Sequence, residues 1–376
     1  MNVTVLTPDV SHNCLGRAHL LAELLSRTHD VQIVGPQFGD GVWSPVADDY
    51  DYEFAEAGSR LHSFCRAVPA LLRLIDGDVV LVSKPRMQSY GVGLLKTLGE
   101  EYPLVLDIDD WETGFTLGEA GAFSYLRALP TLVDINSLYY KLLMERLVPV
   151  ADELIVSNCF LADRFGGEII PHVRDTDAFD PDRFSVTAAR REFNLPLDDH
   201  LIMFSGTPRP HKGVEDLVHA VSELSRDDTR VVLVGAHDSD YVDELRRLGG
   251  DSLIVRGQQP FDTLPRWIAA ADVVAIPQRD RPETRGQLPA KVFDAMAMGK
   301  PIVATAVSDL PEILDGCGLV VDPESPRRLR EAIVRLLDDP TLRDSLGRRA
   351  RRRCIERYSH DAVAPQLSEI VRSAVE

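Results

Sequence analysis

Short apolar runs alternate with amphipathic segments along the whole chain. Three segments, 18–25, 214–221 and 264–271, keep apolar residues at the i, i+3, i+4, i+7 spacing of a helix face. Ten apolar runs have the length and composition of buried strands, at 3–6, 31–34, 79–82, 104–106, 154–156, 202–204, 231–234, 273–276, 302–304 and 319–321. Such alternation predicts parallel sheets covered by helices on both faces. Because ten strands exceed one doubly wound sheet of ordinary size, we expect an α/β protein with two Rossmann-like units.

The boundary between the two units is expected in a polar stretch rich in Pro and Asp. Residues 170–181 have the composition of a loop, and a helix-like segment at 186–193 precedes the strand at 202–204. The predicted division is therefore an N-terminal domain at 1–182, a C-terminal domain at 183–356 and a last helix within 357–376.

Length and composition favour a globular protein of the reducing interior. The 376 residues, 44% of them apolar, are enough for two cores. No apolar run reaches the length of a membrane span, and the chain enters its first strand without a basic region, so a signal peptide is not expected. The five cysteines form no C-x-x-C pair, which argues against a zinc site or a disulfide framework.

The chain carries a formal charge of −18, and only six of its 41 basic residues are lysine. This composition is typical of a salt-adapted, GC-rich organism, although codon bias alone produces the same excess of arginine. Phosphate contacts dominate affinity for nucleic acids, so a charge this negative disfavours nucleic acid as a partner.

The first informative motif spans residues 202–214, Ile-Met-Phe-Ser-Gly-Thr-Pro-Arg-Pro-His-Lys-Gly-Val. An apolar run ends at Gly206, a short loop carries Arg209 and Lys212, and a helical pattern begins. A strand, a glycine-containing loop and a helix N-terminus together make an anion site. The segment does not match the P-loop pattern, because His211 replaces a glycine and Gly213 replaces the hydroxyl residue that binds Mg²⁺. A nucleoside triphosphatase is therefore disfavoured.

A second motif spans residues 289–305, where Asp294 lies in a short helical segment that ends at Gly299 and leads into a strand. An acidic residue at this place could bind a ligand, or it could lie on the solvent face of a helix capped at Gly299. Both interpretations stay open on this motif alone.

In this order and at this separation, the two motifs resemble the donor half of retaining glycosyltransferases with the GT-B fold, family 4. The resemblance implies two Rossmann-like domains with an interdomain cleft and a C-terminal helix that crosses back to the first domain. It also implies transfer of a hexosyl unit from a nucleoside-diphosphate sugar to a hydroxyl acceptor, with retention and without a metal. The acceptor could be a lipid-linked glycan, a polysaccharide or a small molecule. No cofactor is expected besides the nucleotide sugar, which is a co-substrate.

The resemblance implies roles for several residues around the donor diphosphate. Lys212 matches the family's lysine at the leaving phosphate. Thr207 occupies the place of the usual arginine, so Arg209 is the expected substitute. Gly206 and Gly16, the latter in a loop before the helix at 18–25, are expected to face the diphosphate.

The second motif is similar to the family's E-x7-E motif, with departures. Asp294 lies at the second Glu, which binds the ribose of the donor in the family. Gly286 replaces the first Glu, and Glu283 could supply the missing carboxylate. The backbone N–H groups of Gln287 and Leu288 are expected to meet the phosphate or the sugar.

Three carboxylates, Asp107, Asp109 and Asp110, follow the predicted strand at 104–106. Doubly wound sheets place ligands at the carboxyl ends of their strands. The cluster could be the D-x-D metal site of a glycosyltransferase with the GT-A fold, could line the acceptor pocket, or could cap the next segment. We prefer the acceptor pocket, with Asp109 or Asp110 orienting the acceptor hydroxyl, and expect no metal.

Two other functions compete with glycosyl transfer: a sugar-nucleotide epimerase of the same fold and a non-catalytic scaffold that binds nucleotide sugars. A nicotinamide dehydrogenase is disfavoured because no G-x-G-x-x-G follows a strand. The apolar and aromatic stretch 123–147 could dock on a membrane surface or form a core helix. The expected location is the cytoplasm, with peripheral contact at the membrane left open.

Overall fold

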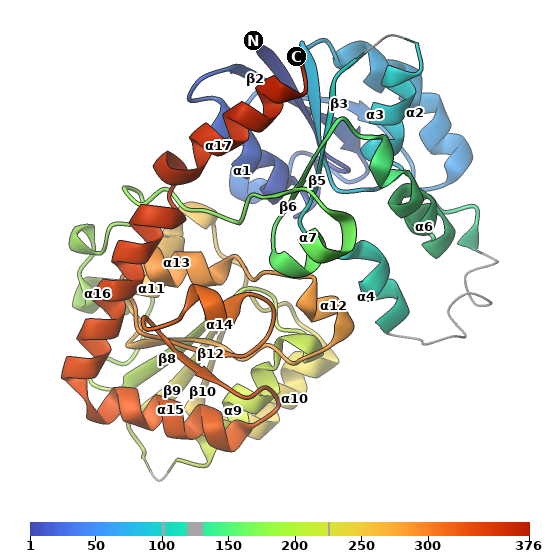
Figure 1. The fold of residues 1–376 in the computed structure, drawn as a ribbon. Helices are drawn as coiled ribbons and strands as arrows, with labels where there is room; N and C mark the ends of the chain where they lie inside the picture. The colour runs from blue at the N-terminus through green and yellow to red at the C-terminus, as the bar shows by residue number, and fades with distance from the viewer. Residues whose placement is uncertain (100–101, 119–130, 225) are drawn as a thin grey trace. The chain divides into compact units, whose positions relative to one another are not determined.

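The computed structural model describes residues 1–99, 102–118, 131–224 and 226–376. They form two compact units, coloured along the chain in Figure 1. The first unit contains residues 1–172, 286–288 and 363–376, and the second contains 173–285 and 289–362. Both boundaries predicted from the sequence, 182/183 and 356/357, fall inside the second unit by this division.

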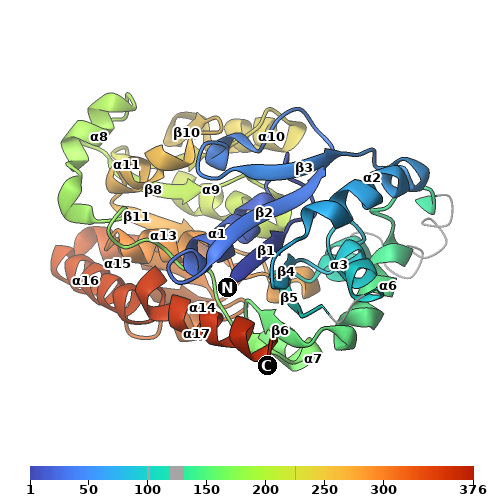
Figure 2. The ribbon, with the colours of Figure 1, turned by 90° about the horizontal axis from the view of Figure 1, so that it is seen from above.

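The first unit is built on a seven-stranded parallel sheet in the order β3-β2-β1-β4-β5-β6-β7. Figure 2 shows this order from β3 to β6. The strands are β1 (Asn2–Leu6), β2 (Asp30–Gln37), β3 (Tyr52–Glu56), β4 (Val79–Ser83), β5 (Leu104–Ile108), β6 (Glu153–Val156) and β7 (Glu168–Ile169). The strand order reverses direction beside β1, which pairs with β2 on one side and with β4 on the other.

Helices cover both faces of this sheet, as the continuous apolar strands predict. Alternate strand residues such as Leu6, Val82 and Leu106 form one apolar cluster with residues of α2, α3, α6 and α7. Helix α1 packs on β1, β2 and β4 from the other face of the sheet. The helices of the unit are α1 (Leu15–Leu25), α2 (Leu61–Leu74), α3 (Tyr90–Thr97), α4 (Glu112–Gly118), α6 (Leu138–Leu147), α7 (Cys159–Phe165) and most of α17 (His360–Ser373). The chain therefore returns to its first unit at its C-terminal end.

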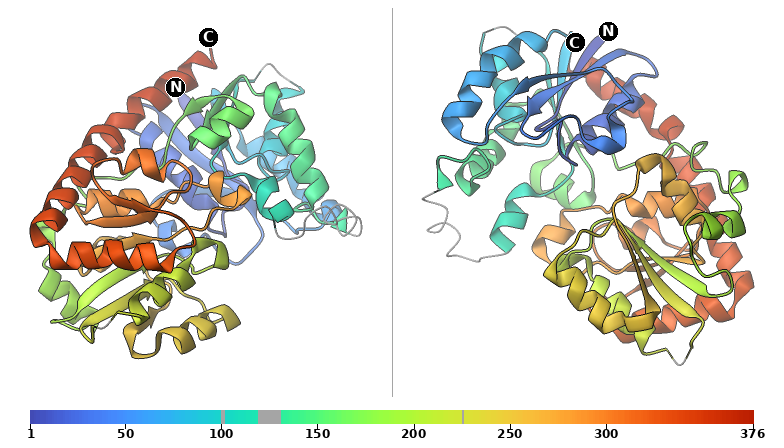
Figure 3. Two further views of the ribbon diagram at one scale, coloured as in Figure 1. Left: turned by 60° about the horizontal axis from the view of Figure 1, so that its bottom comes forward. Right: turned by 180° about the vertical axis from the view of Figure 1, so that it is seen from behind.

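The second unit contains a six-stranded parallel sheet in the order β10-β9-β8-β11-β12-β13. Its strands are β8 (His200–Ser205), β9 (Thr229–Val234), β10 (Leu253–Arg256), β11 (Val273–Ile276), β12 (Ile302–Thr305) and β13 (Leu319–Val321). Residues of α9, α10 and α15 form the core on one face, and α13 packs on β11 and β12 (Figure 3). Its helices are α8 (Val186–Glu192), α9 (Val214–Ser222), α10 (Asp240–Gly249), α11 (Leu264–Ala269), α12 (Pro282–Arg285), α13 (Lys291–Ala297), α14 (Leu310–Ile313), α15 (Pro326–Asp338) and α16 (Pro340–Arg357).

All ten predicted strands are present, and the two sheets confirm the prediction of two Rossmann-like units. Three strands, β3, β7 and β10, were not predicted, and each lies at the edge of its sheet. An edge strand has a neighbour on one side only and is covered less than a central strand, so β3 is largely exposed and β10 is half-buried throughout.

The stretch 123–147, for which membrane docking and a core helix were both predicted, lies partly outside the described residues. Its described part contains α6, in which Leu138 and Met144 are buried and Leu143 is exposed. Within the ranges that the structure describes, no helix combines the length and the apolar character needed to span a bilayer.

Candidate functional site

The loop that follows β8 in the second unit depends on a glycine where the strand ends. Gly206 has φ of +111°, a backbone conformation that other residues rarely adopt, and its N–H donates to the carbonyl of Val234 at 2.7 Å. A Cβ added there would lie 3.3 Å from Nζ of Lys291. The missing side chain of Gly206 thus leaves room at the carboxyl end of β8 beside Lys291, which belongs to another element.

A second glycine joins the loop to α9. Gly213 has φ of +64°, and a Cβ there would lie 1.8 Å from the carbonyl oxygen of Pro277, so no other residue fits without moving the backbone. Gly213 closes the short 3₁₀ turn Pro210–Lys212 and begins α9. The positive end of α9 therefore faces the same loop that carries Lys212.

Arg279 fixes this loop to α9. Its guanidinium donates to both carboxylate oxygens of Asp216 at 2.9 and 2.8 Å and to Glu215 at 3.0 Å. These hydrogen bonds, chiefly those to Asp216, raise the pKa of Arg279. Its backbone N–H donates to the carbonyl of His211 at 3.0 Å. We did not predict this residue from the sequence, because nothing in the local pattern indicates that it reaches across to α9.

The two predicted diphosphate cations differ in their surroundings. Lys212 is half-buried, and its Nζ donates to the carbonyl of Thr207 at 2.9 Å. Arg209 is exposed, and its carbonyl accepts a hydrogen bond from the N–H of Lys212 at 2.9 Å, but its guanidinium has no hydrogen bond or ion pair to the part of the chain that the structure describes. Their roles at a bound diphosphate remain predictions.

Lys291, the first residue of α13, is a third cation near this loop, and we did not predict it as a site residue. Its Nζ lies 3.9 Å from the centroid of the Phe204 ring. Burial lowers the pKa of Lys291 well below its usual value, and the charge of Lys212 lowers it further. Lys291 and Lys212 are therefore close enough to repel each other.

Asp294, on the next turn of α13, is 4% exposed, so the interpretation that places it on a solvent face is wrong. Its carboxylate forms an ion pair with Nε of Arg174, which also donates to the carbonyl of Val173 at 2.7 Å. Its predicted contact with a ribose stays a prediction. Glu283, in α12, has a buried oxygen, Oε2, with no hydrogen-bond partner among the described residues.

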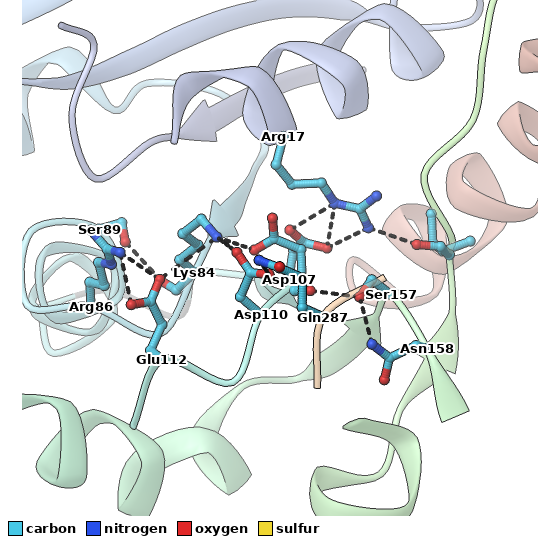
Figure 4. Close-up of polar contacts among 12 residues, drawn as sticks. Arg17, Lys84, Arg86, Ser89, Asp107, Asp110, Glu112, Ser157, Asn158 and Gln287 are labelled. Atoms are coloured by element: carbon cyan, nitrogen blue, oxygen red, sulfur yellow. Dashed lines mark hydrogen bonds and ion pairs between the residues drawn. The ribbon is translucent and has the colours of Figure 1, made fainter. Parts of the chain in front are cut away.

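A buried network of charges occupies the carboxyl end of β5 in the first unit (Figure 4). Asp107 is fully buried and accepts three hydrogen bonds from Arg17 of α1, at 2.8, 3.2 and 3.2 Å. Arg17 also donates to the carbonyls of Ile170 and Pro171 at 2.7 and 3.1 Å. Arg17 thus ties α1, β5 and the segment after β7 together.

Lys84 forms ion pairs with the next two carboxylates. This buried residue, at the end of β4, has φ of +68°, and its Nζ donates to Asp109 and Asp110 at 2.5 and 2.9 Å. Burial alone would lower the pKa of Lys84, but the carboxylates of Asp109, Asp110 and Glu112 outweigh burial and raise it.

Glu112, the first residue of α4, completes the network. Nη2 of Arg86 donates to both of its carboxylate oxygens, at 2.6 and 2.8 Å. Burial would raise the pKa of Glu112, but Arg86 and Lys84 together lower it. The described side chains contain no group of three or more His, Cys, Asp or Glu arranged to hold a metal ion. The role of Asp107, Asp109 and Asp110 at an acceptor is not tested by this geometry and stays a prediction.

Residues 286–288 belong to the first unit. The N–H of Trp111 donates to the carbonyl of Gly286 at 3.2 Å, and Nε2 of Gln287 donates to Asp110 at 3.1 Å. Leu288 is buried. A Cβ on Gly286 would lie 2.7 Å from Cβ of Trp111, so a side chain at this position, which we predicted to match the family's first Glu, would require Trp111 to move. The predicted donor contacts of these three residues stay predictions.

Gly16 lies in the first turn of α1, because the helix begins at Leu15, earlier than the predicted residue 18. The ring of Trp43 would be 3.3 Å from a Cβ at this position. Close packing of Trp43 therefore accounts for the glycine, and its predicted place in the loop before the helix is wrong. Its contact with a diphosphate is untested.

Comparison with known proteins finds a family similar to the second unit. Residues 199–339, from β8 through α15, match the family model described as glycosyl transferases group 1. Over these residues the chain resembles this family. The match contains both sequence motifs, including the Gly206 loop and α13 with Lys291 and Asp294.

Group 1 relatives align with part of the chain. The D-inositol 3-phosphate glycosyltransferase of Kineococcus radiotolerans is 30% identical over 266 residues, which cover 62% of this chain and 59% of that protein. The alpha-D-kanosaminyltransferase of Streptomyces kanamyceticus is 30% identical over 184 residues, 47% of this chain and 46% of that protein. The chain thus spans about half to three fifths of the length of the curated relatives it matches.

Solved structures of glycosyltransferases match nearly the whole chain. Anabaena HepE, solved in complex with UDP and glucose, superposes with a TM-score of 0.78 at 18% identity and covers 99% of this chain and 100% of its own. The chain therefore has the GT-B fold. The GT-A interpretation of Asp107, Asp109 and Asp110, which requires a different fold, is wrong.

Proposed function

We propose that the protein transfers a hexosyl group from a nucleoside-diphosphate sugar to a hydroxyl acceptor, with retention at the anomeric carbon and without a metal. The observation that carries the proposal is the loop from Gly206 to Gly213. It presents the ammonium of Lys212 and the N-terminus of α9 in one place, supported by Arg279. A group 1 family model covers this loop.

The chemistry of the transfer explains why such a loop is needed. Negative charge grows on the β-phosphate as the bond to the anomeric carbon breaks. Fixed positive groups at that oxygen stabilise the transition state more than the bound substrate, which is what raises the rate. Lys212 and the helix dipole supply these groups in our proposal. The released phosphate oxygen then accepts the proton of the acceptor hydroxyl on the same face of the sugar, as retention requires.

The relatives guide the choice of substrates. A structure of HepE holds UDP and glucose, so UDP-hexoses are the first donors to test. A curated relative is named for D-inositol 3-phosphate, which makes a small hydroxylated acceptor a reasonable first choice beside lipid-linked glycans and polysaccharides. We propose no acceptor more specific than these classes.

The test is a panel of UDP-, GDP-, ADP- and dTDP-hexoses. Thermal shift identifies the donor, because a ligand that binds the native state raises the apparent stability. Release of the nucleoside diphosphate is then measured with and without acceptors, and NMR of the product reports the anomeric configuration. Isomerised donor in the absence of acceptor would indicate an epimerase. Binding without release for any acceptor would indicate a scaffold, and inversion at the anomeric carbon would contradict retention.

A further inference from the structure

Lys291 reaches from α13 to the end of β8. Its Nζ lies over the ring of Phe204, 3.9 Å from the centroid, and it is the nearest atom to a Cβ built on Gly206. Lys212, the predicted leaving-group cation, is close enough to lower the pKa of Lys291. Two of the six lysines of the chain thus gather around the one glycine at which the motif loop leaves its strand.

The ammonium of Lys291 has little compensation in the protein itself. Among the residues that the structure describes, it forms no hydrogen bond and no ion pair. A ring face attracts a cation, but more weakly than a carboxylate does. Asp294, on the same helix, attracts Lys291 and partly opposes the fall in its pKa, but the Asp294 carboxylate itself forms its ion pair with Arg174. A half-buried cation next to a second cation costs stability, and such a cost is expected where an anionic ligand supplies the missing charge.

A neighbouring lysine shows what a purely structural arrangement looks like. Lys300, just after α13, is also buried enough that its pKa falls to about 8. Its Nζ, however, donates to the carbonyls of Ala269 and Ala271 at 2.8 and 2.9 Å. Lys300 therefore holds two loops of the fold together, whereas the described part of the chain offers Lys291 no acceptor.

We propose that Lys291 binds the diphosphate of the donor together with Lys212 and supplies the second cation that we had expected from Arg209. The inference rests on the proposed function, since it concerns the same anionic co-substrate. It follows from the room that Gly206 leaves beside Lys291, from the neighbouring charge of Lys212, and from the absence of a hydrogen bond or ion pair between the Lys291 ammonium and the described residues. Lys291 would hold a phosphate oxygen, and Lys212 would hold another.

The first test is binding of the nucleoside diphosphate that the wild-type protein binds most tightly among UDP, GDP, ADP and dTDP. Lys291→Met keeps the length and the apolar stem of the side chain and removes only the charge. Calorimetry should show affinity for the diphosphate falling about ten- to a hundredfold, as expected for the loss of a charge-assisted hydrogen bond. Affinity for the matching nucleoside, which has no phosphate, should not change. Lys291→Arg should restore part of the diphosphate affinity.

The second test is the melting temperature without ligand. If Lys291 is a cation held for a ligand, Lys291→Met should melt at a higher temperature than the wild type, because an uncompensated charge is gone. The matched control is Lys300→Met, which should melt at a lower temperature, because two carbonyls lose their donor, and should bind the diphosphate as the wild type does. Opposite shifts in melting temperature would separate a binding lysine from a structural one.

The outcomes distinguish the inference from the proposed function. If the wild-type protein binds none of the four nucleoside diphosphates, the proposed function fails and the inference fails with it. If the wild type binds one of them and Lys291→Met binds it equally well, only the inference is overturned. It is also overturned if Lys291→Met melts lower and loses affinity for nucleoside and diphosphate alike, since Lys291 would then be a structural residue.

Discussion

At position 286 a glycine stands where the resemblance leads us to expect a glutamate, and the packing of Trp111 accounts for the glycine. A Cβ at Gly286 would lie 2.7 Å from Cβ of Trp111, and the N–H of Trp111 is bonded to the carbonyl of the same glycine. A side chain there would require Trp111 to move. Glu283 therefore stays our predicted source of a carboxylate for the sugar, because its buried Oε2 has no hydrogen-bond partner among the described residues.

We expect Lys212→Ala to nearly eliminate turnover while leaving the fold intact. Its ammonium is predicted to stabilise charge that grows in the transition state, and a charge-assisted hydrogen bond there contributes about 1.5–3 kcal/mol. At about 1.4 kcal/mol per tenfold, the rate should fall at least ten- to a hundredfold. Lys212→Arg should recover part of it, because a planar guanidinium reaches the phosphate differently. The measurements are kcat/KM and the melting curve. A near-normal kcat/KM of Lys212→Ala would contradict the prediction that this loop binds the leaving group.

Replacing Asp294 should affect donor binding more than the step after binding. A carboxylate on the ribose lies away from the developing charge, so its contribution should be similar in the ground and transition states. For Asp294→Ala we expect the donor KM to rise with little change in kcat. Arg174→Met breaks the same ion pair but keeps the acid, so it separates loss of the ion pair from loss of the ribose contact. A fall in kcat at unchanged KM would contradict the placement.

Among the elements, α1, β4, β5 and α4 are joined by charge rather than by apolar packing alone. We expect Arg17→Met to destabilise the first unit by about 3–5 kcal/mol, because Asp107 would remain buried without a partner. The control is Arg327→Met, which breaks the exposed pair with Glu331 and should leave the stability nearly unchanged, because water and salt screen an exposed pair. Urea unfolding measures both. Equal, small losses would mean that water reaches Asp107 and that the network is not closed.

The same network leads us to expect that activity survives EDTA. Asp109 and Asp110 already accept hydrogen bonds from Lys84, and protein cations are proposed at the diphosphate. The measurement is the transfer rate after chelation and dialysis, compared with the rate after adding Mn²⁺ back. If EDTA stopped transfer and Mn²⁺ restored it, the carboxylates after β5 would have to be reconsidered as metal ligands.

Sequence patterns predicted elements well when burial dictated them and poorly when it did not. The strands with fully buried apolar runs, such as β8 and β12, were all predicted. The edge strand β3 (Tyr-Glu-Phe-Ala-Glu) carries no apolar run, and β10 was missed although it carries a short one. A local motif is enough to mark Lys212 as a candidate, and its role stays a prediction. Arg279 and Lys291 were missed because their contacts, with α9 and with Phe204, join elements that are distant in sequence.

For the whole molecule, we expect that removing residues 363–376 destabilises the first unit and leaves the second intact. Val363, Leu367 and Val371 of α17 are buried, and Ser368 is hydrogen-bonded to His29, which follows α1. Hydrogen exchange should therefore accelerate in α1 and β2, while β8 and β9 keep their protection. A chain that ends after Ser373 retains α17 and should behave as the full chain does. Uniform acceleration in both sheets would show that the units do not unfold separately.

The assignment of residues 286–288 to the first unit has a consequence for how enzymes of this kind could exchange parts. The chain passes from one unit to the other after residues 172, 285, 288 and 362. A gene cassette for the second unit would therefore carry residues 286–288, of which Gly286 is bonded to Trp111 and Gln287 to Asp110 of the original first unit. A chimera that joins residues 173–362 to the first unit of a relative should work best when the recipient also offers Gln287 an acceptor such as Asp110. Recombination could then transfer the donor preference only between proteins whose first units make the same contacts with residues 286–288.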